Sequence, residues 1–415
     1  MNRVPKLRFT EFREDWKKVS LNEIVKENIE SIPMPENDYI RIGIYCHAKG
    51  TFQEYVTKEK ALNVDTMYVV HKNNLIVNIT FAWEHAIAIT KDIDEGKIVS
   101  HRFPTYDFRT GHLYKFYKYL ILDKKFKYKL GLASPGGAGR NRVLNKCEFL
   151  KIQVYTTSKK EQEKIADFLS KVDERITVQE NIISDLENQK KGLMQKLFNQ
   201  EIRFKAADGS DYPKWNNDSF PDIFTMLQNN TFSRDCLNYE YGTVKNIHYG
   251  DILIKFGASL QPDDNRIPYV NSNIDVQRFS KESYLKEGDI VFADTAEDFT
   301  VGKSIEICNI DNVKLLSGLH TIPCRPKKEF ASKYLGYYTN SERYHKQLLP
   351  LIQGIKVSSI SRTSICNTFI EYPCLEEQKK IVNCISAFDK KIEIERKILE
   401  DWQQIKKGLL QQMFV

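Results

Sequence analysis

Lysine, arginine and aromatic residues form the clusters in this sequence that are best suited to binding a ligand. In the first half, tyrosines, phenylalanines and lysines alternate from residue 114 to 129, and a glycine-rich loop follows at 136–139. Arginine and lysine bind phosphates and guanine edges, and glycine lets the backbone approach a phosphate closely. The residues that we expect to contact DNA are Lys115, Lys118, Arg140, Arg142, Lys245, Lys255, Lys303, Lys356, Ser358 and Arg362.

Enzyme motifs are incomplete in this chain. Gly302-Lys303-Ser304 matches only the end of a phosphate-binding P-loop, because Glu297 occupies the position of the first glycine. Residues 95–97 match half of a metal-nuclease pattern, and the histidines show no HExxH spacing. Single histidines such as His101 and His320 are therefore expected to be structural. The sequence predicts no catalytic site, no metal site and no cofactor within this chain.

Length and composition further limit the class of protein that this chain can be. A chain of 415 residues should hold more than one domain. No apolar run is long enough to span a membrane, and the N-terminus has no apolar signal segment, so we expect a cytoplasmic protein. The eight cysteines never form a CxxC pair, which argues against a zinc ribbon or a disulfide framework. The net charge of +7 is compatible with a nucleic-acid partner.

One long segment occurs twice. The first copy, EQEKIADFLSKVDERITVQENIISDLENQKKGLMQKLF, begins at Glu161. The second, EQKKIVNCISAFDKKIEIERKILEDWQQIKKGLLQQMF, begins at Glu377, a constant offset of 216 residues (377 − 161) without a gap. Of the 38 aligned residues, 15 are identical. A repeat of this size predicts pseudo-two-fold symmetry within one chain.

Both copies have the pattern of paired helices. Apolar residues recur at alternating spacings of four and three, the heptad signature of a coiled coil. Polar residues interrupt both seams at the same two places, Gln179 and Lys190 in the first copy and Glu395 and Lys406 in the second. The residues that we expect to pair the helices are Ile165, Leu169, Val172, Ile176, Ile183, Leu186 and Leu193 with Ile381, Ile385, Phe388, Ile392, Leu399, Trp402 and Leu409.

The starts of the two helices are also marked. Ser158 and Glu161 have the spacing of a capping box, and Glu376 and Glu377 fall in a first turn, where the helix dipole favours anions. A helix of 38 residues would be roughly 57 Å long at 1.5 Å per residue. Related halves usually close around a two-fold axis, so the helices should be antiparallel, with a globular segment at each end of the rod.

We therefore predict an α+β protein in which two globular domains are separated by two long helices that pair as an antiparallel coiled coil. The domains would be residues 1–156 and 201–372, and the helices 157–200 and 373–415. The predicted strands are Ile42–Cys46, Leu75–Ile79, Ile252–Phe256 and Ile290–Phe292, and the predicted shorter helices are Leu113–Leu122 and Ser332–Leu349.

The combination of motifs resembles a known family. Each half opens on Arg-Phe followed by Trp, at Arg8-Phe9 and Arg203-Phe204, and ends in a Glu-Gln-x-Lys-Ile helix that closes with Lys-Lys-Gly-Leu-x-Gln-x-x-Phe. This arrangement is similar to the specificity subunit of type I restriction–modification systems. The resemblance covers essentially the whole chain and is carried by the duplicated helices.

The resemblance implies two target recognition domains that read a bipartite, asymmetric double-stranded DNA site. It implies that the helices act as a spacer and that the chain assembles with two modification (methyltransferase) subunits and with ATP-dependent restriction subunits. S-adenosylmethionine, ATP and magnesium would be bound by those partner subunits, and this chain would not be an enzyme.

Two other classes of protein stay open at this point. A coiled-coil adaptor without DNA recognition would show no salt-dependent DNA affinity, whereas a DNA-binding protein loses affinity steeply with salt. A nuclease or methyltransferase in its own right would modify or cut DNA without partner subunits.

Overall fold

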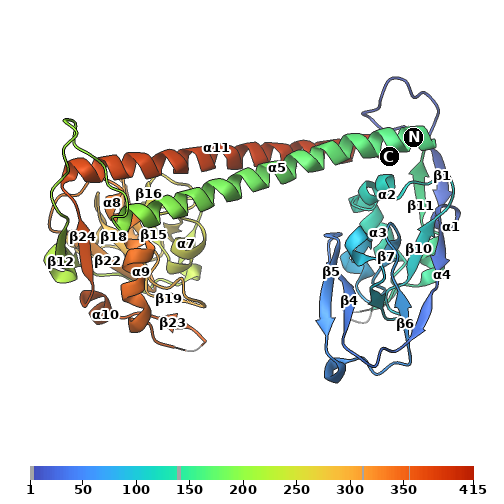
Figure 1. Ribbon diagram of the computed structural model, residues 1–415, viewed down its shortest axis with the longest axis horizontal. Helices are drawn as coiled ribbons and strands as arrows, with labels where there is room; N and C mark the ends of the chain where they lie inside the picture. Colours follow the sequence, from blue (N-terminus) through green and yellow to red (C-terminus); the bar gives the residue numbers. More distant parts are fainter. Residues whose placement is uncertain (1–3, 138–141, 311–312, 355) are drawn as a thin grey trace. The chain divides into compact units, whose positions relative to one another are not determined.

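The computed structural model describes residues 4–137, 142–310, 313–354 and 356–415. The chain divides into two compact units (Figure 1). Unit 1 comprises Met1–Asn181 together with Arg396–Val415, and unit 2 comprises Ile182–Glu395. The last twenty residues of the chain therefore belong to the same unit as its beginning.

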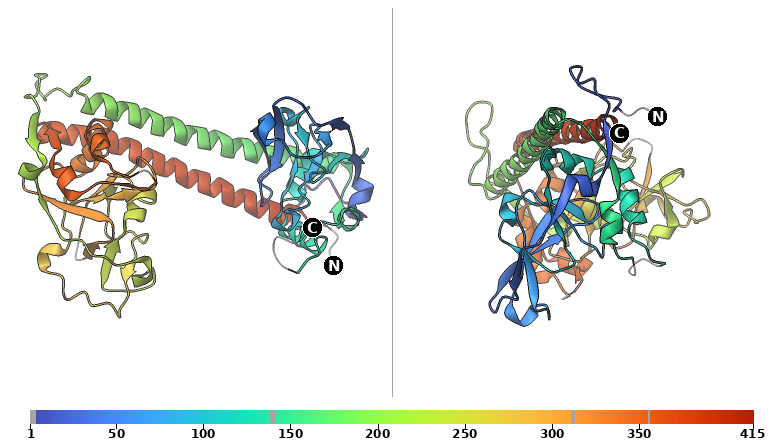
Figure 2. Two further views of the ribbon diagram at one scale, coloured as in Figure 1. Left: turned by 90° about the horizontal axis from the view of Figure 1, so that it is seen from below. Right: turned by 90° about the vertical axis from the view of Figure 1, so that its right-hand side faces the viewer.

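The two repeated segments form long helices, α5 (Lys159–Phe198) and α11 (Leu375–Met413). Within each unit they run side by side (Figures 1 and 2). In unit 1, the start of α5 shares a core with the end of α11, while Asp173 further along α5 pairs with Lys406 at 2.7 Å. The same relation holds in unit 2, where Lys190 pairs with Asp389 at 2.5 Å. The helices are antiparallel in both units.

Three sheets form unit 1. The element bounds are β1 (Lys17–Ser20) with β11 (Gln153–Thr156); β2 (Val25–Asn28), β10 (Thr105–Phe108), β7 (Leu75–Val77) and β8 (Ile87–Ile89) in that order; and β3 (Ser31–Pro33), β6 (Thr66–Val69), β9 (Ile98–Val99), β4 (Tyr39–Ile44) and β5 (Thr51–Val56). The short helices are α1 (Leu21–Ile24), α2 (Tyr114–Leu120), α3 (Lys124–Leu132), α4 (Lys146–Leu150) and the 3₁₀ turns η1 (Lys58–Lys60), η2 (Ala82–Glu84) and η3 (Asp92–Asp94).

Unit 2 follows a related plan, with sheets of different sizes and a further two-stranded sheet among its described residues. Its sheets are β12 (Asn216–Ser219) with β24 (Phe369–Tyr372); β13 (Phe224–Met226), β22 (Thr321–Pro326), β18 (Ile290–Ala293), β20 (Ser304–Ile307) and β16 (Ser259–Leu260); β14 (Leu237–Asn238), β17 (Tyr269–Val270), β15 (Val244–Ile247) and β21 (Lys314–Ser317); and β19 (Thr295–Ala296) with β23 (Ser358–Ser359). Its short helices are α6 (Phe220–Ile223), α7 (Tyr249–Ile254), α8 (Tyr334–Thr339), α9 (Glu342–Leu348) and α10 (Arg362–Cys366), with 3₁₀ turns η5 (Arg234–Cys236), η6 (Lys281–Ser283) and η7 (Leu349–Leu351). The order β13-β22-β18-β20 corresponds to β2-β10-β7-β8, so the two units share a core topology.

The predicted α+β class with antiparallel paired helices is confirmed, and two of its details are corrected. The run Ile252–Phe256 was expected to be a strand, but it lies largely in helix α7, whose first turn is capped by the His248 side chain. An apolar run this short shows neither the helical nor the strand period clearly, and here the cap by His248 favours a helix. The stretch Ser332–Leu349 is not one helix, because the hydroxyl of Ser341 starts a second one, α9.

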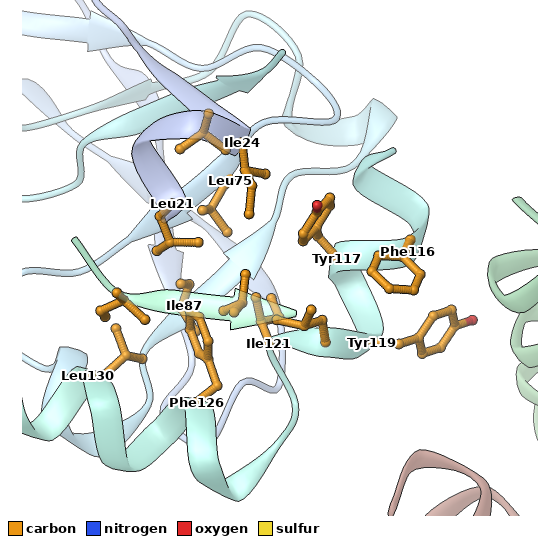
Figure 3. Packing of buried hydrophobic residues seen from close by; sticks show 14 of the residues in the cluster. Leu21, Ile24, Leu75, Ile87, Phe116, Tyr117, Tyr119, Ile121, Phe126 and Leu130 are labelled. Atoms are coloured by element: carbon orange, nitrogen blue, oxygen red, sulfur yellow. The ribbon is translucent and has the colours of Figure 1, made fainter. Parts of the chain in front are cut away.

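The core of unit 1 includes the end of the chain. Figure 3 shows part of this core, including Phe116 and Tyr117 from α2. The ring of Phe414 packs against Trp16 and Phe116, with centroid distances of 6.3 and 5.3 Å. In unit 2 the equivalent Phe198, at the end of α5, packs against Tyr334 and Tyr338 at 6.1 and 5.7 Å. Each globular core therefore contains the C-terminal end of a long helix.

This packing changes the role of four residues that were expected to pair the helices. Ile165 and Leu169, and likewise Ile381 and Ile385, lie in the globular cores, where their buried side chains meet residues from the domain as well as the neighbouring helix. Of the other predicted seam residues, Val172, Ile183, Leu186 and Ile392 are buried, and Ile176, Leu193, Phe388, Leu399, Trp402 and Leu409 are half-buried.

The repeated Glu-Gln pair anchors each domain to the start of its helix. The buried carboxylate of Glu161 accepts hydrogen bonds from Arg8 at 2.7 and 2.9 Å, and that of Glu377 accepts from Arg203 at 3.1 and 2.6 Å. The amide of Ser158 is therefore not the partner of the Glu161 side chain, and only half of the expected capping box forms, through the Ser158 hydroxyl. In each half, the arginine of the opening motif takes the place of that backbone amide as the hydrogen-bond donor to the glutamate.

The lysines that interrupt the two seams bind carboxylates of the facing helix. Asp173 also accepts a hydrogen bond from the hydroxyl of Tyr119 on α2, and Asp389 accepts one from Tyr337 on α8. Burial opposes ionisation of Asp173, but the hydrogen bonds from Lys406, Lys118 and Tyr119 outweigh it and lower the pKa of this carboxyl. Lys190 and Lys406, with their carboxylate partners, therefore each join both long helices to a globular domain.

Candidate nucleic-acid interface

In each unit three loops meet at one backbone position. In unit 1 this position is Ile79, which follows β7: its amide donates to the carbonyl of Arg102 at 3.0 Å, and its carbonyl accepts from Leu144 at 2.8 Å. In unit 2 it is Asp294, which follows β18: its amide donates to His320 at 3.1 Å, and its carbonyl accepts from Ile360 at 2.8 Å. We call these positions the first and second loop junctions.

The first junction exposes an aromatic side chain, an imidazole and a guanidinium group. Phe81 follows Ile79 closely and is 38% exposed, and the side chains of His101 and Arg102 are exposed in the loop that bonds to Ile79. The third loop contains the predicted residues Arg140 and Arg142. Arg140 lies outside the residues that the structure describes.

The second junction has the same backbone with different side chains. The ring Nδ1 of His320 lies 3.2 Å from Asp294 Oδ1, to which Thr295 also donates a hydrogen bond at 2.7 Å. Thr295 begins β19, which pairs with β23 at Ser358 and Ser359. Lys356 is exposed on the loop before β23. Hydroxyl, imidazole and ammonium groups of this kind can donate to or accept from base edges and phosphates.

Four predicted DNA-contacting residues instead bind carbonyl groups of the protein. The ammonium of Lys245 is buried and donates to Pro262 and Asp264 at 2.8 and 3.1 Å. The protein's own carbonyls account for this ammonium group, and contact of Lys245 with DNA stays an untested prediction. The other three are Lys303, which donates to the carbonyls of Leu253 and Phe256 near the end of α7; Arg142, which donates to Gly131 and Ser134; and Arg362, which donates to Leu227 and to the side chain of Asn229.

Two further predicted residues form ion pairs within their own units. Lys118 pairs with Asp173 at 3.0 Å, and Lys255 pairs with Asp251 at 2.9 Å. The first pair joins α2 to α5, and the second lies within α7 and its C-terminal cap; these pairs are the simplest account of both lysines. Within the ranges that the structure describes, Lys115, Lys356 and Ser358 show no such partner for their side chains, and their contact with DNA stays a prediction.

Sequence reasoning missed the two histidines of the junctions. His101 and His320 were expected to be structural, and they lie near matching places in the two halves. The match is not exact, because the carbonyl that binds the first junction belongs to Arg102, the residue after His101, whereas in the second junction it belongs to His320 itself. Phe81 and Thr295 gave no signal in the sequence.

His248 supports the second junction and makes its stability depend on pH. It caps α7 by accepting from Gly250, and the neighbouring ring of Tyr249 packs against His320 with centroids 5.3 Å apart. Burial and the positive charge of Arg234 lower the pKa of His248 to about 4. A depressed pKa means that the neutral imidazole stabilises the fold above pH 6.5, and that this contribution is lost as the pH falls toward 4.

We expect the replacement His248→Asn to remove this dependence, because asparagine caps helices well and does not titrate. Relative to the variant, the wild type should lose about 2 kcal/mol of unfolding free energy between about pH 7.5 and about pH 5. Urea unfolding of both proteins at the two pH values measures this difference. Equal pH dependence in the two proteins would show that His248 does not titrate as expected.

The described residues contain no cluster of three histidine, cysteine or carboxylate side chains that could hold a metal ion. Within the same residues, no helix is long and apolar enough to cross a membrane.

Comparison with known proteins identifies the family. Residues 13–188 and 213–403 match the type I restriction modification DNA specificity domain. A curated relative, the type I restriction enzyme MjaVIII specificity subunit of Methanocaldococcus jannaschii, is 27% identical over 303 residues, which cover 70% of this chain and 68% of that protein. The two matched ranges make up well over half of the chain, and each contains one loop junction and most of one long helix.

Solved structures show the same fold at low sequence identity. One is a chain from a study of complex assembly and conformational transition of the type I R-M system, with a TM-score of 0.58, 16% identity, and coverage of 95% of this chain and 96% of that one. Another is the type I restriction–modification S subunit of M. genitalium, with a TM-score of 0.51, 14% identity and 99% coverage of both chains. The chain therefore belongs to the family of type I restriction–modification specificity subunits, whose function is sequence-specific DNA recognition.

Proposed function

We propose that this chain reads a bipartite, asymmetric DNA site, with one part of the site read at each loop junction. The observation that carries this proposal is the repetition of one backbone arrangement with different side chains. The same pair of backbone hydrogen bonds surrounds Ile79 and Asp294, whereas Phe81, His101 and Arg102 in unit 1 have no identical counterparts among the residues around Thr295 and His320 in unit 2. Two equivalent backbone arrangements that carry different side chains are suited to recognising two different base sequences.

The test is a methylome. The chain would be co-expressed with its cognate modification subunit in a host that lacks DNA methylation, and modified adenines mapped by single-molecule sequencing. We expect a single bipartite motif that disappears when this chain is omitted. Replacement of residues 1–156 by the equivalent domain of a relative should change only one part of the motif. No motif from a complex of confirmed composition would contradict the proposal and favour the adaptor.

Methyl transfer and restriction would be performed by partner subunits. S-adenosylmethionine, ATP and magnesium would be bound there, and this chain would supply recognition. Two copies of one modification subunit need two equivalent surfaces, and the repeated helices offer them. Val178 and Ile182, one turn apart on α5, are 50% and 37% exposed, and the equivalent Ile394 and Ile398 on α11 are 60% and 37% exposed. Exposed apolar pairs of this kind favour a protein partner.

We expect Val178→Asp with Ile182→Asp to remove one of the two modification subunits, because a charge placed in an apolar contact loses its hydration without gaining a partner. Native mass spectrometry of the complex would show one bound subunit in place of two. The substitution Thr177→Asp, at an exposed position beside the pair, is the matched control and should leave both subunits bound. Retention of two subunits by the double variant would exclude this surface.

A further inference from the structure

Helix α3 presents a cationic face for which the described part of the chain supplies no ion-pair partner. Its inner side, with Phe126 and Leu130, is buried in the core of unit 1 (Figure 3). On its outer side Tyr128 and Leu132 are 69% and 66% exposed, one turn apart. Lysines surround them. We call the set Lys124, Lys125, Lys127, Tyr128 and Leu132 the α3 face.

The charges of the α3 face oppose the stability of the helix itself. Lys124 and Lys125 occupy the first turn, which contains no acidic residue, and the positive end of the helix dipole disfavours cations there. The nearest carboxylate in the sequence, Asp123, caps the helix by accepting from the amide of Lys125 at 3.0 Å. Among the residues that the structure describes, no salt bridge involves any lysine of this face. Folding alone therefore gives no reason for these charges.

The corresponding helix of unit 2 is built differently. Helix α9 also begins after a capping side chain, Ser341, but its first turn contains Glu342, which pairs with Lys346 at 2.9 Å. Its arginine, Arg343, pairs with Glu371 at 2.8 Å. The arginine and lysine of α9 are paired within the unit, so α9 does not share the unpaired cationic face of α3.

The α3 face is continuous with the first loop junction. The guanidinium of Arg142 donates to the carbonyl of Gly131, in the last turn of α3, at 2.8 Å and to that of Ser134 at 3.2 Å. Two residues later, Leu144 binds Ile79 at the junction itself. The same guanidinium lies over the ring of Trp83, in the turn that follows Phe81. A duplex read at this junction would meet the last turn of α3 first, and Lys124 and Lys125 lie about 10 Å further along the same helix.

We propose that the α3 face binds the phosphate backbone of the DNA next to the part of the site that unit 1 reads. This proposal rests on the proposed function, because it takes the first loop junction to be a DNA-reading site. Lysine binds phosphate as a point charge and selects no base, so the α3 face contributes affinity without sequence preference. The aromatic Tyr128 gives the lysine side chains an apolar surface along which to lie. The cations of α9 are paired within unit 2, so this contact with the backbone is expected on the unit 1 part of the site and not at α9.

The variant Lys124→Gln with Lys125→Gln tests this proposal in the complex with the modification subunits. The DNA probe is a duplex that contains the methylated motif. We expect about tenfold weaker binding at moderate salt, and a slope of log affinity against log salt that is smaller by about two, since each lost phosphate contact removes about 0.9. The methylated motif should not change. Phosphate ethylation should interfere with wild-type binding at phosphates next to the unit 1 part of the site, and the variant should lose that interference.

Two controls separate charge at this face from charge in general and from misfolding. Lys58→Gln with Lys60→Gln removes the same charge from exposed η1 of the same unit and should leave affinity nearly unchanged. Lys124→Glu with Lys125→Glu should raise the melting temperature, because anions suit the first turn, while weakening DNA binding further.

Three results would overturn the proposal while the wild type binds its motif: unchanged affinity and salt slope in the glutamine variant, a changed motif, or loss of a modification subunit with normal DNA affinity. The last would identify an acidic protein surface as the occupant. A wild-type complex that binds no specific sequence would instead contradict the proposed function.

Discussion

Replacement of Phe414 by alanine is expected to destabilise unit 1, although Phe414 is the penultimate residue of the chain. Its ring is buried against Trp16 and Phe116, so its removal leaves a cavity in the core of the N-terminal domain. Truncations of buried phenylalanine cost about 3–5 kcal/mol, and we expect a value near the lower end, since the chain end can partly close the cavity. Hydrogen exchange should accelerate throughout α2.

The equivalent substitution in the other repeat is the matched control. Phe198→Ala removes a ring from the core of unit 2, where it contacts Tyr334 and Tyr338. It should accelerate exchange in α8 and leave α2 protected. If Phe414→Ala affected only the last turns of α11, the contribution of this helix end to the core of unit 1 would be disproved.

Replacement of Glu377 by glutamine is expected to loosen the segment between α5 and β12. The carboxylate of Glu377 is buried and accepts two hydrogen bonds from the guanidinium of Arg203, which itself donates to the carbonyl of Pro213 at 2.7 Å. Glutamine cannot accept two parallel hydrogen bonds or balance the charge. Breaking a fully buried pair costs about 3–5 kcal/mol, and we expect about 2–3 kcal/mol here, because Arg203 is partly exposed and keeps some hydration.

Limited proteolysis measures the local effect, and chemical unfolding measures the loss of stability. Cleavage should accelerate between α5 and β12 in Glu377→Gln, and between the N-terminus and β1 in the equivalent Glu161→Gln. A double variant in which Arg203 and Glu377 are both methionine should recover much of the loss, since an apolar pair needs no partner charge. Failure of the double variant to recover any stability would mean that the ion pair is not the source of the effect.

The heptad pattern and the constant offset of the repeat predicted the long helices and their antiparallel pairing from the sequence. These features are local or follow from symmetry: apolar spacing depends on the helical period, and two copies of one segment pack in equivalent ways. The seam interruptions at Lys190 and Lys406 were visible for the same reason. Their partners, Asp389 and Asp173, belong to the repeat as well, but the pairing depends on which residues face one another across the two helices.

The roles of individual cations were decided by tertiary structure. Lys245 and Arg142 have the residue type and surroundings of DNA contacts, yet their charged groups bind backbone carbonyls. Arg362 reaches Leu227, 135 residues earlier in the chain. A cation binds whichever acceptors the fold brings within about 3 Å, and sequence distance carries no information about that.

The sequence by itself determined the family, the two-fold repeat and the helical framework, because period, offset and residue type are properties of the chain as written. Only the tertiary structure decided which loops meet at Ile79 and Asp294, and that the end of α11 completes the core of unit 1. Both depend on contacts between residues far apart in the chain. Such contacts form where buried backbone groups find hydrogen-bond partners and apolar side chains leave water, and these requirements are met by the whole fold rather than by any one segment.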